Sequence, residues 1–238
     1  MSWNVLGKSV QRGFAIHLAQ RVNVDLVLIQ EPGASFTNAS GIVEDGWSCL
    51  SVESNERRCI TALWAAGVNV AQATDMRVGA GGQSMFCMVV APQMIFRLAS
   101  CHAQFTDRGG GGRGGSSVAG QWMVDFHKAC RTRVIDFSIG DTNLAGTVAP
   151  RRNPSRGEPR TILGDRATTV NRNTGQGISS YDRAYLYTDT LACQAAGRVL
   201  AEYRGNWAKD GDLVVGLNGN ESSQYSQTDH IPIYCDLQ

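Results

Sequence analysis

Charged and polar side chains follow apolar stretches at several points of this chain, where they could do chemistry. Glu31 ends the nearly continuous apolar run 25–30, and His102 comes near the end of the apolar run 93–105. A strand buried on both faces has little reason to end on a charge, so Glu31 is a candidate functional residue. Carboxylate and amide oxygens suit a hard divalent cation, and imidazoles suit proton transfer and charge stabilisation on a phosphoryl group.

Short polar strings of this kind recur along the sequence. They are Trp3-Asn4, Gln30-Glu31, Cys101-His102, Gly140-Asp141-Thr142-Asn143, Tyr181-Asp182-Arg183 and Thr228-Asp229-His230. Each alone has an ordinary explanation as a turn, a cap or a structural histidine. Together they contain the parts of metal-assisted phosphodiester hydrolysis, namely oxygen ligands, a group to position water, and imidazoles. The two remaining histidines, His17 and His127, fall in helical stretches and are predicted to be structural.

Composition limits the class of protein. The chain has 238 residues, 42% of them hydrophobic, which excludes a wholly disordered protein. No apolar run approaches the roughly 18 residues that a transmembrane helix needs. The formal net charge is +1, and only three of the cations are lysines, so arginine dominates. Arginine suits bidentate phosphate binding, although a biased genome composition would give the same excess.

The apolar pattern predicts more strands than helices. Helices are expected over 9–22 and 118–130, where apolar residues recur at helical spacing. Strands are expected at about 58–66, 68–75, 84–91, 93–105, 181–188, 192–202, 212–217 and 230–237. Hairpin-like neighbours mixed with one strand–helix–strand crossover favour a mixed α/β sandwich over a doubly wound parallel sheet.

The seven cysteines, at positions 49, 59, 87, 101, 130, 193 and 235, form no CxxC pair. This spacing argues against a zinc ribbon. Most of them sit in apolar runs, where cysteine is expected to be a small buried hydrophobe. The odd count leaves at least one thiol free or paired between chains, and the redox compartment stays open. No signal peptide is visible, which fits either a protein kept inside the cell or a mature fragment.

The ordered strings WNVLG, QEPG, SCHAQF, GDTN, YDRAYL and TDHIPI resemble the exonuclease–endonuclease–phosphatase superfamily, whose type member is pancreatic deoxyribonuclease. The resemblance spans residues 3–233. It implies one catalytic domain, 1–238, with an α/β four-layer sandwich of two packed mixed β-sheets flanked by helices. It also implies a Mg²⁺-dependent site at one edge of the sandwich, with Mn²⁺ or Ca²⁺ as alternatives.

The resemblance assigns metal-binding roles to Asn4, Glu31 and Asp229. It makes His102 the histidine that contacts the scissile phosphate. Two positions depart from the family's pattern: Thr142 stands where GDFN has an aromatic residue, and Thr228 stands where SDH has serine. Neither change removes an expected catalytic group.

The remaining catalytic roles fall on residues of the last three strings. Asp141 and Asn143 are implied to position water and phosphate. Asp182 is implied to orient His230, which closes the set together with Asp229. His230 and Asp141 would share the activation of water, and the sequence leaves open which group removes the proton.

Two arginine-bearing segments are candidate substrate contacts. The Gly- and Arg-rich run 108–117 is expected to be a flexible surface loop. The segment 150–172 lies between GDTN and YDR, where the family places substrate-contacting loops. The candidate substrate-binding residues are Arg108, Arg113, Arg151, Arg152 and Arg156.

Among the branches of the superfamily, the chain is most similar to the catalytic B subunit of cytolethal distending toxin. This similarity implies an endonuclease that nicks DNA, delivery or receptor-binding toxin subunits as partners, and a secreted toxin acting in a target cell; without it, a cytoplasmic enzyme is expected. Two alternatives stay open. One is a phosphoinositide phosphatase or a sphingomyelinase-type lipid phosphohydrolase, and the other is a nucleic-acid-binding module with an inactive site.

Overall fold

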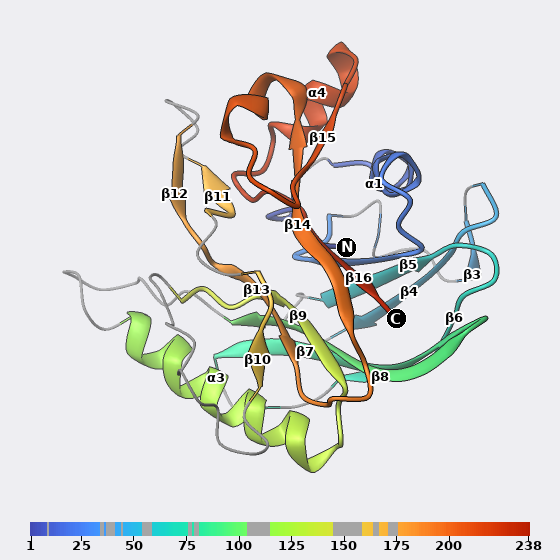
Figure 1. Cartoon of the computed structure of the whole chain (residues 1–238), viewed down its shortest axis with the longest axis vertical. Helices are drawn as coiled ribbons and strands as arrows, with labels where there is room; N and C mark the ends of the chain where they lie inside the picture. The colour runs from blue at the N-terminus through green and yellow to red at the C-terminus, as the bar shows by residue number, and fades with distance from the viewer. Residues whose placement is uncertain are drawn as a thin grey trace.

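The computed structural model consists of two packed β-sheets with helices on both outer sides (Figure 1). The structure describes residues 1–8, 10–33, 36, 41–43, 45–53, 59–75, 78, 81–103, 115–144, 159–163, 167–170 and 176–238.

The larger sheet contains eight strands. In spatial order they are β15 (Leu213–Val215), β14 (Cys193–Ala201), β16 (Ile233–Leu237), β1 (Ser2–Asn4), β2 (Leu26–Gln30), β5 (Cys59–Trp64), β4 (Ser48–Glu53) and β3 (Gly41–Ile42). The pairs β1–β2 and β14–β15 are parallel and the others antiparallel, so the sheet is mixed.

The smaller sheet contains six strands. In spatial order they are β10 (Arg160–Thr161), β13 (Asp182–Leu186), β9 (Phe137–Asp141), β8 (Met94–Ala103), β7 (Gly82–Ala91) and β6 (Asn69–Asp75). Only β8–β9 is parallel among its pairs, so this sheet is mixed as well. A separate two-stranded ribbon pairs β11 (Thr169–Val170) with β12 (Gly177–Ser179).

Helices cover the outer faces of both sheets. The described helices are α1 (Arg12–Arg21), α3 (Gly115–Thr132), the 3₁₀ helix η1 (Glu202–Trp207) and α4 (Gly219–Tyr225). In Figure 1, α1 and α4 lie on the side of the larger sheet and α3 lies below the smaller one. None of the helices in the described parts of the chain is both long and apolar enough to span a membrane.

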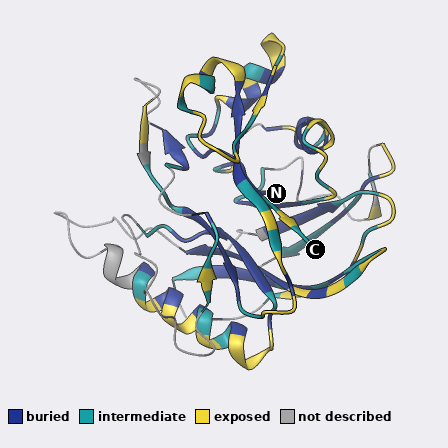
Figure 2. Ribbon diagram, in the orientation of Figure 1, coloured by how far each residue is buried: buried dark blue, intermediate teal, exposed yellow. Residues whose placement is uncertain are grey.

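Three of the four core clusters among the described residues lie between these layers. The alternation of side chains along β2 shows why this strand is apolar throughout. Val27 and Ile29 pack with Phe14 of α1 on the outer face of the larger sheet, whereas Leu28 packs in the cluster between the two sheets. On the outer face of the smaller sheet, Trp122 and Phe126 of α3 stack with ring centres 5.3 Å apart. Figure 2 shows the resulting pattern, with buried central strands and an exposed outer side of α3.

The predicted four-layer sandwich of two mixed sheets is confirmed. The expected helix 9–22 is α1, and Phe14 and Leu18 of its apolar stripe are buried. The expected helix 118–130 is α3, which begins at Gly115. Residues 115–117, which were expected to belong to a flexible loop, are therefore helical. Buried cysteines were also expected in the strands, and Cys87 and Cys101 are at most 1% exposed.

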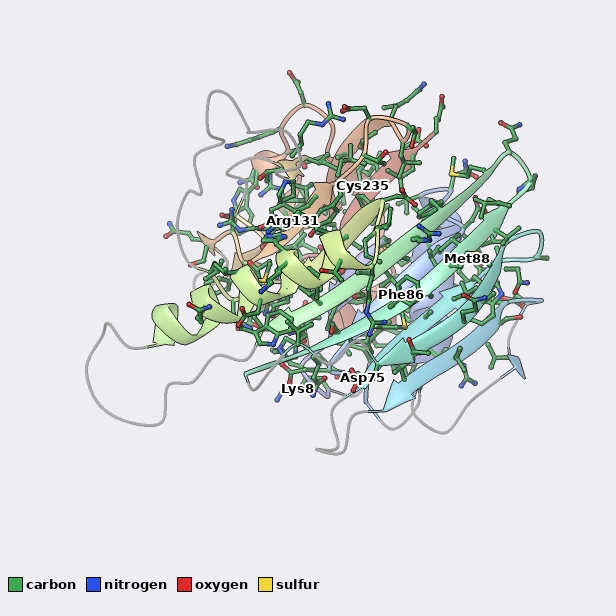
Figure 3. All side chains as sticks on the ribbon, turned by 90° about the horizontal axis from the view of Figure 1, so that it is seen from below. Lys8, Asp75, Phe86, Met88, Arg131 and Cys235 are labelled. Carbon is green, nitrogen blue, oxygen red and sulfur yellow. The ribbon has the colours of Figure 1, made fainter. Side chains whose placement is uncertain are left out.

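Side-chain contacts attach α3 and the turn after it to the smaller sheet. The guanidinium of Arg133 lies 5.8 Å from the centre of the Phe86 ring, which is labelled on β7 in Figure 3. His127 on α3 contacts the Tyr187 hydroxyl through Nδ1 at 2.7 Å, and its ring meets the Tyr185 ring edge-on at 4.7 Å. These contacts agree with the structural role predicted for His127. His17, for which the same role was predicted, has no comparable burial, because its side chain is 58% exposed beside Asp45.

His127 leads to a prediction about stability and pH. Burial, and to a smaller degree the guanidinium of Arg131, lowers the pKa of His127 to about 4, against about 6.5 in an unfolded chain. The unfolded chain therefore binds the extra proton between these pH values. The contribution of neutral His127 to the free energy of unfolding is complete above about pH 6.5. It is lost as the pH falls towards 4, by up to about 3 kcal/mol. Urea unfolding across this range should show the loss in the wild type and a smaller one in His127→Gln; equal pH dependence in both would contradict the assignment.

Candidate active site

The candidate residues lie at the polar end of the space between the two sheets. Ile139 and Ala184 pack between the sheets, so Asp141 and Asp182, each two residues away on the same strand, face the same space. His102 is related to Leu98 of β8 in the same way, four residues further along. The apolar core thus gives way at this edge to carboxylates and imidazoles.

Gly140 brings two of these strands close enough together. Strands β8 and β9 are parallel, and His102 is opposite Asp141 in the register. A Cβ atom at Gly140 would lie 2.1 Å from the carbonyl oxygen of Cys101, which no real side chain tolerates. The glycine before Asp141 is therefore needed for the close approach that places His102 beside this carboxylate.

A cavity of about 300 Å³ opens at this edge. It is lined by Asn4, Leu6, Glu31, His102, Asp141, Asn143, Tyr181, Asp229 and His230. Asp182 lies behind His230 and is 2% exposed. The structure therefore brings together every predicted catalytic and metal-binding residue, from both sheets.

The Asp141 carboxylate is at the centre of the group. Its Oδ2 accepts a hydrogen bond from the Asn4 amide at 2.8 Å, and its Oδ1 accepts one from the Asn143 backbone N–H at 2.9 Å. The Nε2 atoms of His102 and His230 lie 3.9 and 3.7 Å from Oδ2. Since Asp141 is fully buried, a charged carboxylate here depends on these neighbours.

Glu31 occupies the mouth of the cavity. Its Oε1 is 3.0 Å from Nε2 of His102 and accepts a longer hydrogen bond of 3.3 Å from the Asn4 amide. The Glu31 side chain is 29% exposed, whereas that of His102 is 3% exposed. One carboxylate oxygen therefore holds the buried imidazole while the residue itself reaches the solvent.

Three residues around the cavity have left-handed backbone conformations that are rare outside glycine. Leu6, Glu31 and Asn143 have φ angles of 53°, 46° and 47°. Such conformations cost of order 1–3 kcal/mol each and persist where the surroundings fix them, commonly at functional sites. The turns after β1, β2 and β9 are thus strained at the residues that line the cavity.

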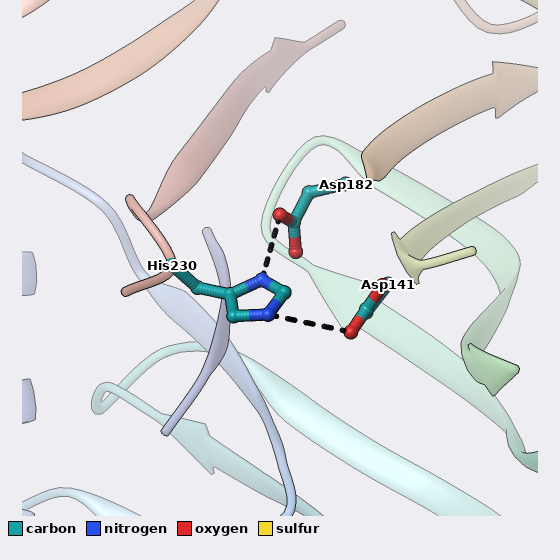
Figure 4. A group of neighbouring side chains, drawn as sticks. All are labelled: Asp141, Asp182 and His230. Atoms are coloured by element: carbon teal, nitrogen blue, oxygen red, sulfur yellow. Dashed lines mark hydrogen bonds and ion pairs between the residues drawn. The ribbon is translucent and has the colours of Figure 1, made fainter. Parts of the chain in front are cut away.

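His230 is held between two carboxylates (Figure 4). Its Nδ1 is 3.0 Å from Oδ2 of Asp182, while Nε2 points towards Asp141. Burial lowers the pKa of His230, but the charges of Asp182 and Asp141 more than offset this effect and raise the pKa to about 10. The two carboxylates therefore favour the protonated imidazole, which can donate a proton from Nε2 towards the cavity.

The two threonines that depart from the family pattern both stabilise the site. The Thr142 hydroxyl donates to the carbonyl of Tyr181 at 2.7 Å and so ties the end of β9 to the start of β13. The Thr228 hydroxyl donates to the carbonyl of Asn4 at 2.8 Å and accepts from the His230 backbone N–H at 3.1 Å. These bonds connect four of the strings in two pairs, GDTN with YDRAYL and TDHIPI with WNVLG.

Gln83 on β7 is opposite His102 in the register and was not predicted as a site residue. Both polar atoms of its carboxamide and Nδ1 of His102 are buried, with no hydrogen-bond partner among the described residues. Tyr181 and Leu6 were also missed, although both line the cavity. Tyr181 and Leu6 both belong to strings that were recognised, YDRAYL and WNVLG, whereas nothing in the sequence marks Gln83.

The proposed arginine contacts fall outside the described residues. This holds for all five of them, Arg108, Arg113, Arg151, Arg152 and Arg156. The described ends of these segments, Ala103 and Leu144, lie near the cavity, because the Asn143 amide donates to the carbonyl of Ala103.

The donors at the site fit a hard divalent cation. Glu31, Asp141 and Asp229 provide carboxylate oxygens around one cavity, the ligand type that Mg²⁺ and Ca²⁺ prefer. Ligand atoms of Asp141, Asp182 and His230 also lie within 4.8 Å of one another. A cation among those three would replace the hydrogen bond between His230 and Asp182, so the Glu31 side of the cavity suits a hard cation better.

Comparison with known proteins shows similarity in structure alone. No family model matches the chain, and no curated protein matches it. TDP2 from D. rerio, complexed with single strand DNA product, is similar with a TM-score of 0.65 and 16% identity over 100% of this chain and 97% of that one. An endonuclease/exonuclease/phosphatase from Bacteroides vulgatus gives 0.61 and 9% over 100% and 97%. The endonuclease domain of TRAS1, a telomere-specific non-LTR retrotransposon, gives 0.60 and 11% over 100% and 96%. The chain therefore has the two-sheet fold of the endonuclease/exonuclease/phosphatase structures.

Proposed function

We propose that this protein is a metal-dependent phosphodiester hydrolase that nicks DNA. The observation that carries the proposal is the arrangement of two imidazoles, His102 and His230, on a single buried carboxylate, Asp141, beside Glu31. Hydrolysis of a phosphodiester requires a polarised phosphoryl oxygen, an activated water and a protonated leaving group. This cavity contains a group suited to each of these tasks.

The positions of the side chains around the cavity support the following roles. A divalent cation bound at the Glu31 side, with Asp229 and the Asn4 amide nearby, would supply Lewis-acid polarisation of a phosphoryl oxygen. His102, donating from Nε2, stabilises the charge that develops on the phosphoryl group. His230 is oriented by Asp182 and holds a proton at Nε2 towards the cavity, and Asp141 positions water and substrate.

DNA is the proposed substrate. The D. rerio TDP2 structure contains a single strand DNA product, and the TRAS1 domain is named an endonuclease. The finer assignment, on the sequence resemblance, is an endodeoxyribonuclease of the cytolethal distending toxin B type, which is secreted, uses delivery subunits and acts in a target cell. Under this assignment Mg²⁺ is the cation, with Mn²⁺ or Ca²⁺ as substitutes.

The test is conversion of supercoiled plasmid to nicked circles in Mg²⁺. We expect His102→Ala to lower the rate about a hundredfold or more, because a group that stabilises phosphoryl charge is lost. EDTA should abolish nicking. His17→Ala is the matched control, because this histidine is exposed at 58% and lies outside the cavity, and its rate should equal that of the wild type.

The alternatives give different results in the same assays. If the protein is a lipid phosphohydrolase, the folded protein should release inorganic phosphate from phosphoinositide micelles and leave plasmid intact. If it is a binding module, the wild type and His102→Ala should bind DNA equally, and neither should nick it. Either outcome overturns the nuclease proposal.

A further inference from the structure

Two cysteines that the proposed reaction does not use lie on adjacent strands of the larger sheet. Cys193 is the first residue of β14, and Cys235 is the middle residue of its antiparallel neighbour β16, labelled in Figure 3. Cys193 is opposite Leu237, two residues beyond Cys235, so both cysteines share a face of the sheet. Both pack against the core cluster between the sheets.

A bulge in β14 lies between the two cysteines. The register shifts between Cys193 and Ala195, so that Ala196 and not Ala195 is opposite Cys235. Without a bulge, diagonal neighbours on antiparallel strands are about 7–8 Å apart, at the outer limit for a disulfide. The bulge bends β14 at this point and increases its local twist, so the diagonal separation differs from that of a regular ladder.

The two thiols influence each other's ionisation. The Cys193 thiol donates a hydrogen bond of 3.3 Å to the carbonyl oxygen of Ala195. The neighbouring Cys235 thiol lowers the pKa of Cys193, whereas the Cys193 thiol and burial raise the pKa of Cys235 well above its usual range. Cys193 is therefore the better nucleophile of the pair.

Accessibility separates this pair from the other cysteines. Cys193 and Cys235 are partly exposed. The other cysteines whose side chains the structure describes, at positions 49, 87, 101 and 130, are at most 1% exposed. An oxidant in solution therefore meets Cys193 before any of these four.

We propose that Cys193 and Cys235 form an intrachain disulfide by exchange with a disulfide oxidant such as oxidised glutathione. The Cys193 thiolate attacks one glutathione sulfur, which forms a mixed disulfide and releases one glutathione thiolate. Cys235 gives its proton to that thiolate and attacks the Cys193 sulfur. The bond between Cys193 and glutathione breaks, and the second glutathione leaves as a thiolate that takes up the proton released when Cys193 ionised.

The disulfide would link β14 covalently to β16. It would close a loop that contains η1, α4 and His230. Closing a loop of this length restricts the unfolded chain, so the oxidised protein should unfold at higher temperature than the reduced one. The site cavity itself contains neither cysteine. Nuclease activity therefore does not enter the test.

The experiment is equilibration of the full chain with oxidised glutathione, followed by intact mass measurement and peptide mapping. The wild type should lose two hydrogen atoms and yield one cross-linked peptide that joins Cys193 to Cys235. Cys235→Ser should retain one glutathione on Cys193, because the resolving thiol is missing, and Cys193→Ser should retain none on Cys235. Ala192→Ser, which adds a hydroxyl beside Cys193 but keeps both thiols, should behave as the wild type.

Two results would overturn the proposal. One is folded wild-type protein in which both thiols are still alkylated by iodoacetamide after equilibration with oxidised glutathione. The other is a cross-link from Cys193 or Cys235 to a different cysteine, including Cys59, whose side chain is not described. A higher melting temperature on oxidation that persists in Cys193→Ser would likewise exclude this bridge as its cause.

Discussion

Asp141→Asn is expected to lower metal-dependent plasmid nicking about a thousandfold while the protein stays folded. The substitution keeps the shape of the side chain but removes the one buried charge that lies near both imidazoles and the Asn4 amide. An effect of this size matches the loss of an acid–base or charge-stabilising group at an enclosed site. Nicking rates at saturating Mg²⁺, with circular dichroism as the check on folding, measure it.

The same variant has a second readout that does not depend on activity. Because the Asp141 charge helps to raise the pKa of His230 to about 10, its removal should lower that pKa in the metal-free protein. An NMR titration of the His230 ring tests the direction. Asp189→Asn is the matched control, since its side chain is 99% exposed, and it should change neither quantity. Asp141→Asn with more than a tenth of wild-type activity would remove Asp141 from the mechanism.

His230→Gln is the other substitution with a large expected effect, again about a thousandfold in the nicking rate. Glutamine can keep a hydrogen bond to Asp182 but cannot carry a proton at the position of Nε2. The loss should therefore appear in kcat, with KM for plasmid little changed. Binding of plasmid in EDTA, measured by gel shift, separates this effect from lost affinity.

Asp182→Asn provides the comparison for His230. It leaves the imidazole in place and removes the carboxylate that orients it at 3.0 Å. If Asp182 is a positioning residue, its variant should be less impaired than His230→Gln, and the double variant should be no worse than His230→Gln alone. Additive losses in the double variant would mean that Asp182 has a role of its own.

The sequence predicts the parts of this fold that depend on apolar periodicity. Strand β2 was predicted from continuous apolar residues, which are needed because Val27 and Leu28 face opposite cores. Helix α4 was missed because GNESSQY has no apolar stripe. Its signal is a capping box instead, in which Asn218 and Glu221 each accept a hydrogen bond from the other's backbone.

Candidate site residues are easier to recognise in this sequence than strand pairing, for a physical reason. A charged residue that follows a largely apolar run can be recognised from the local sequence. Glu31 and Asp141 were identified in this way. Gln83 does not, because its relation to His102 arises from the pairing of β7 with β8 and from burial of both side chains. Pairing partners between distant strands are not encoded in the local pattern that identifies each strand.

The position of β1 between β2 and β16 has a consequence for the protein during its own synthesis. The Trp3 ring nitrogen donates to the carbonyl of His230 at 3.1 Å, and Thr228 donates to Asn4, across more than 220 residues of sequence. On the ribosome, Asn4 and Glu31 can pair early, but His230 and the strand β16 that follows it are translated after the other site residues. Contacts of such separation also form slowly. A nascent chain therefore carries an incomplete set of the proposed catalytic residues until the segment around Asp229 and His230 has been translated.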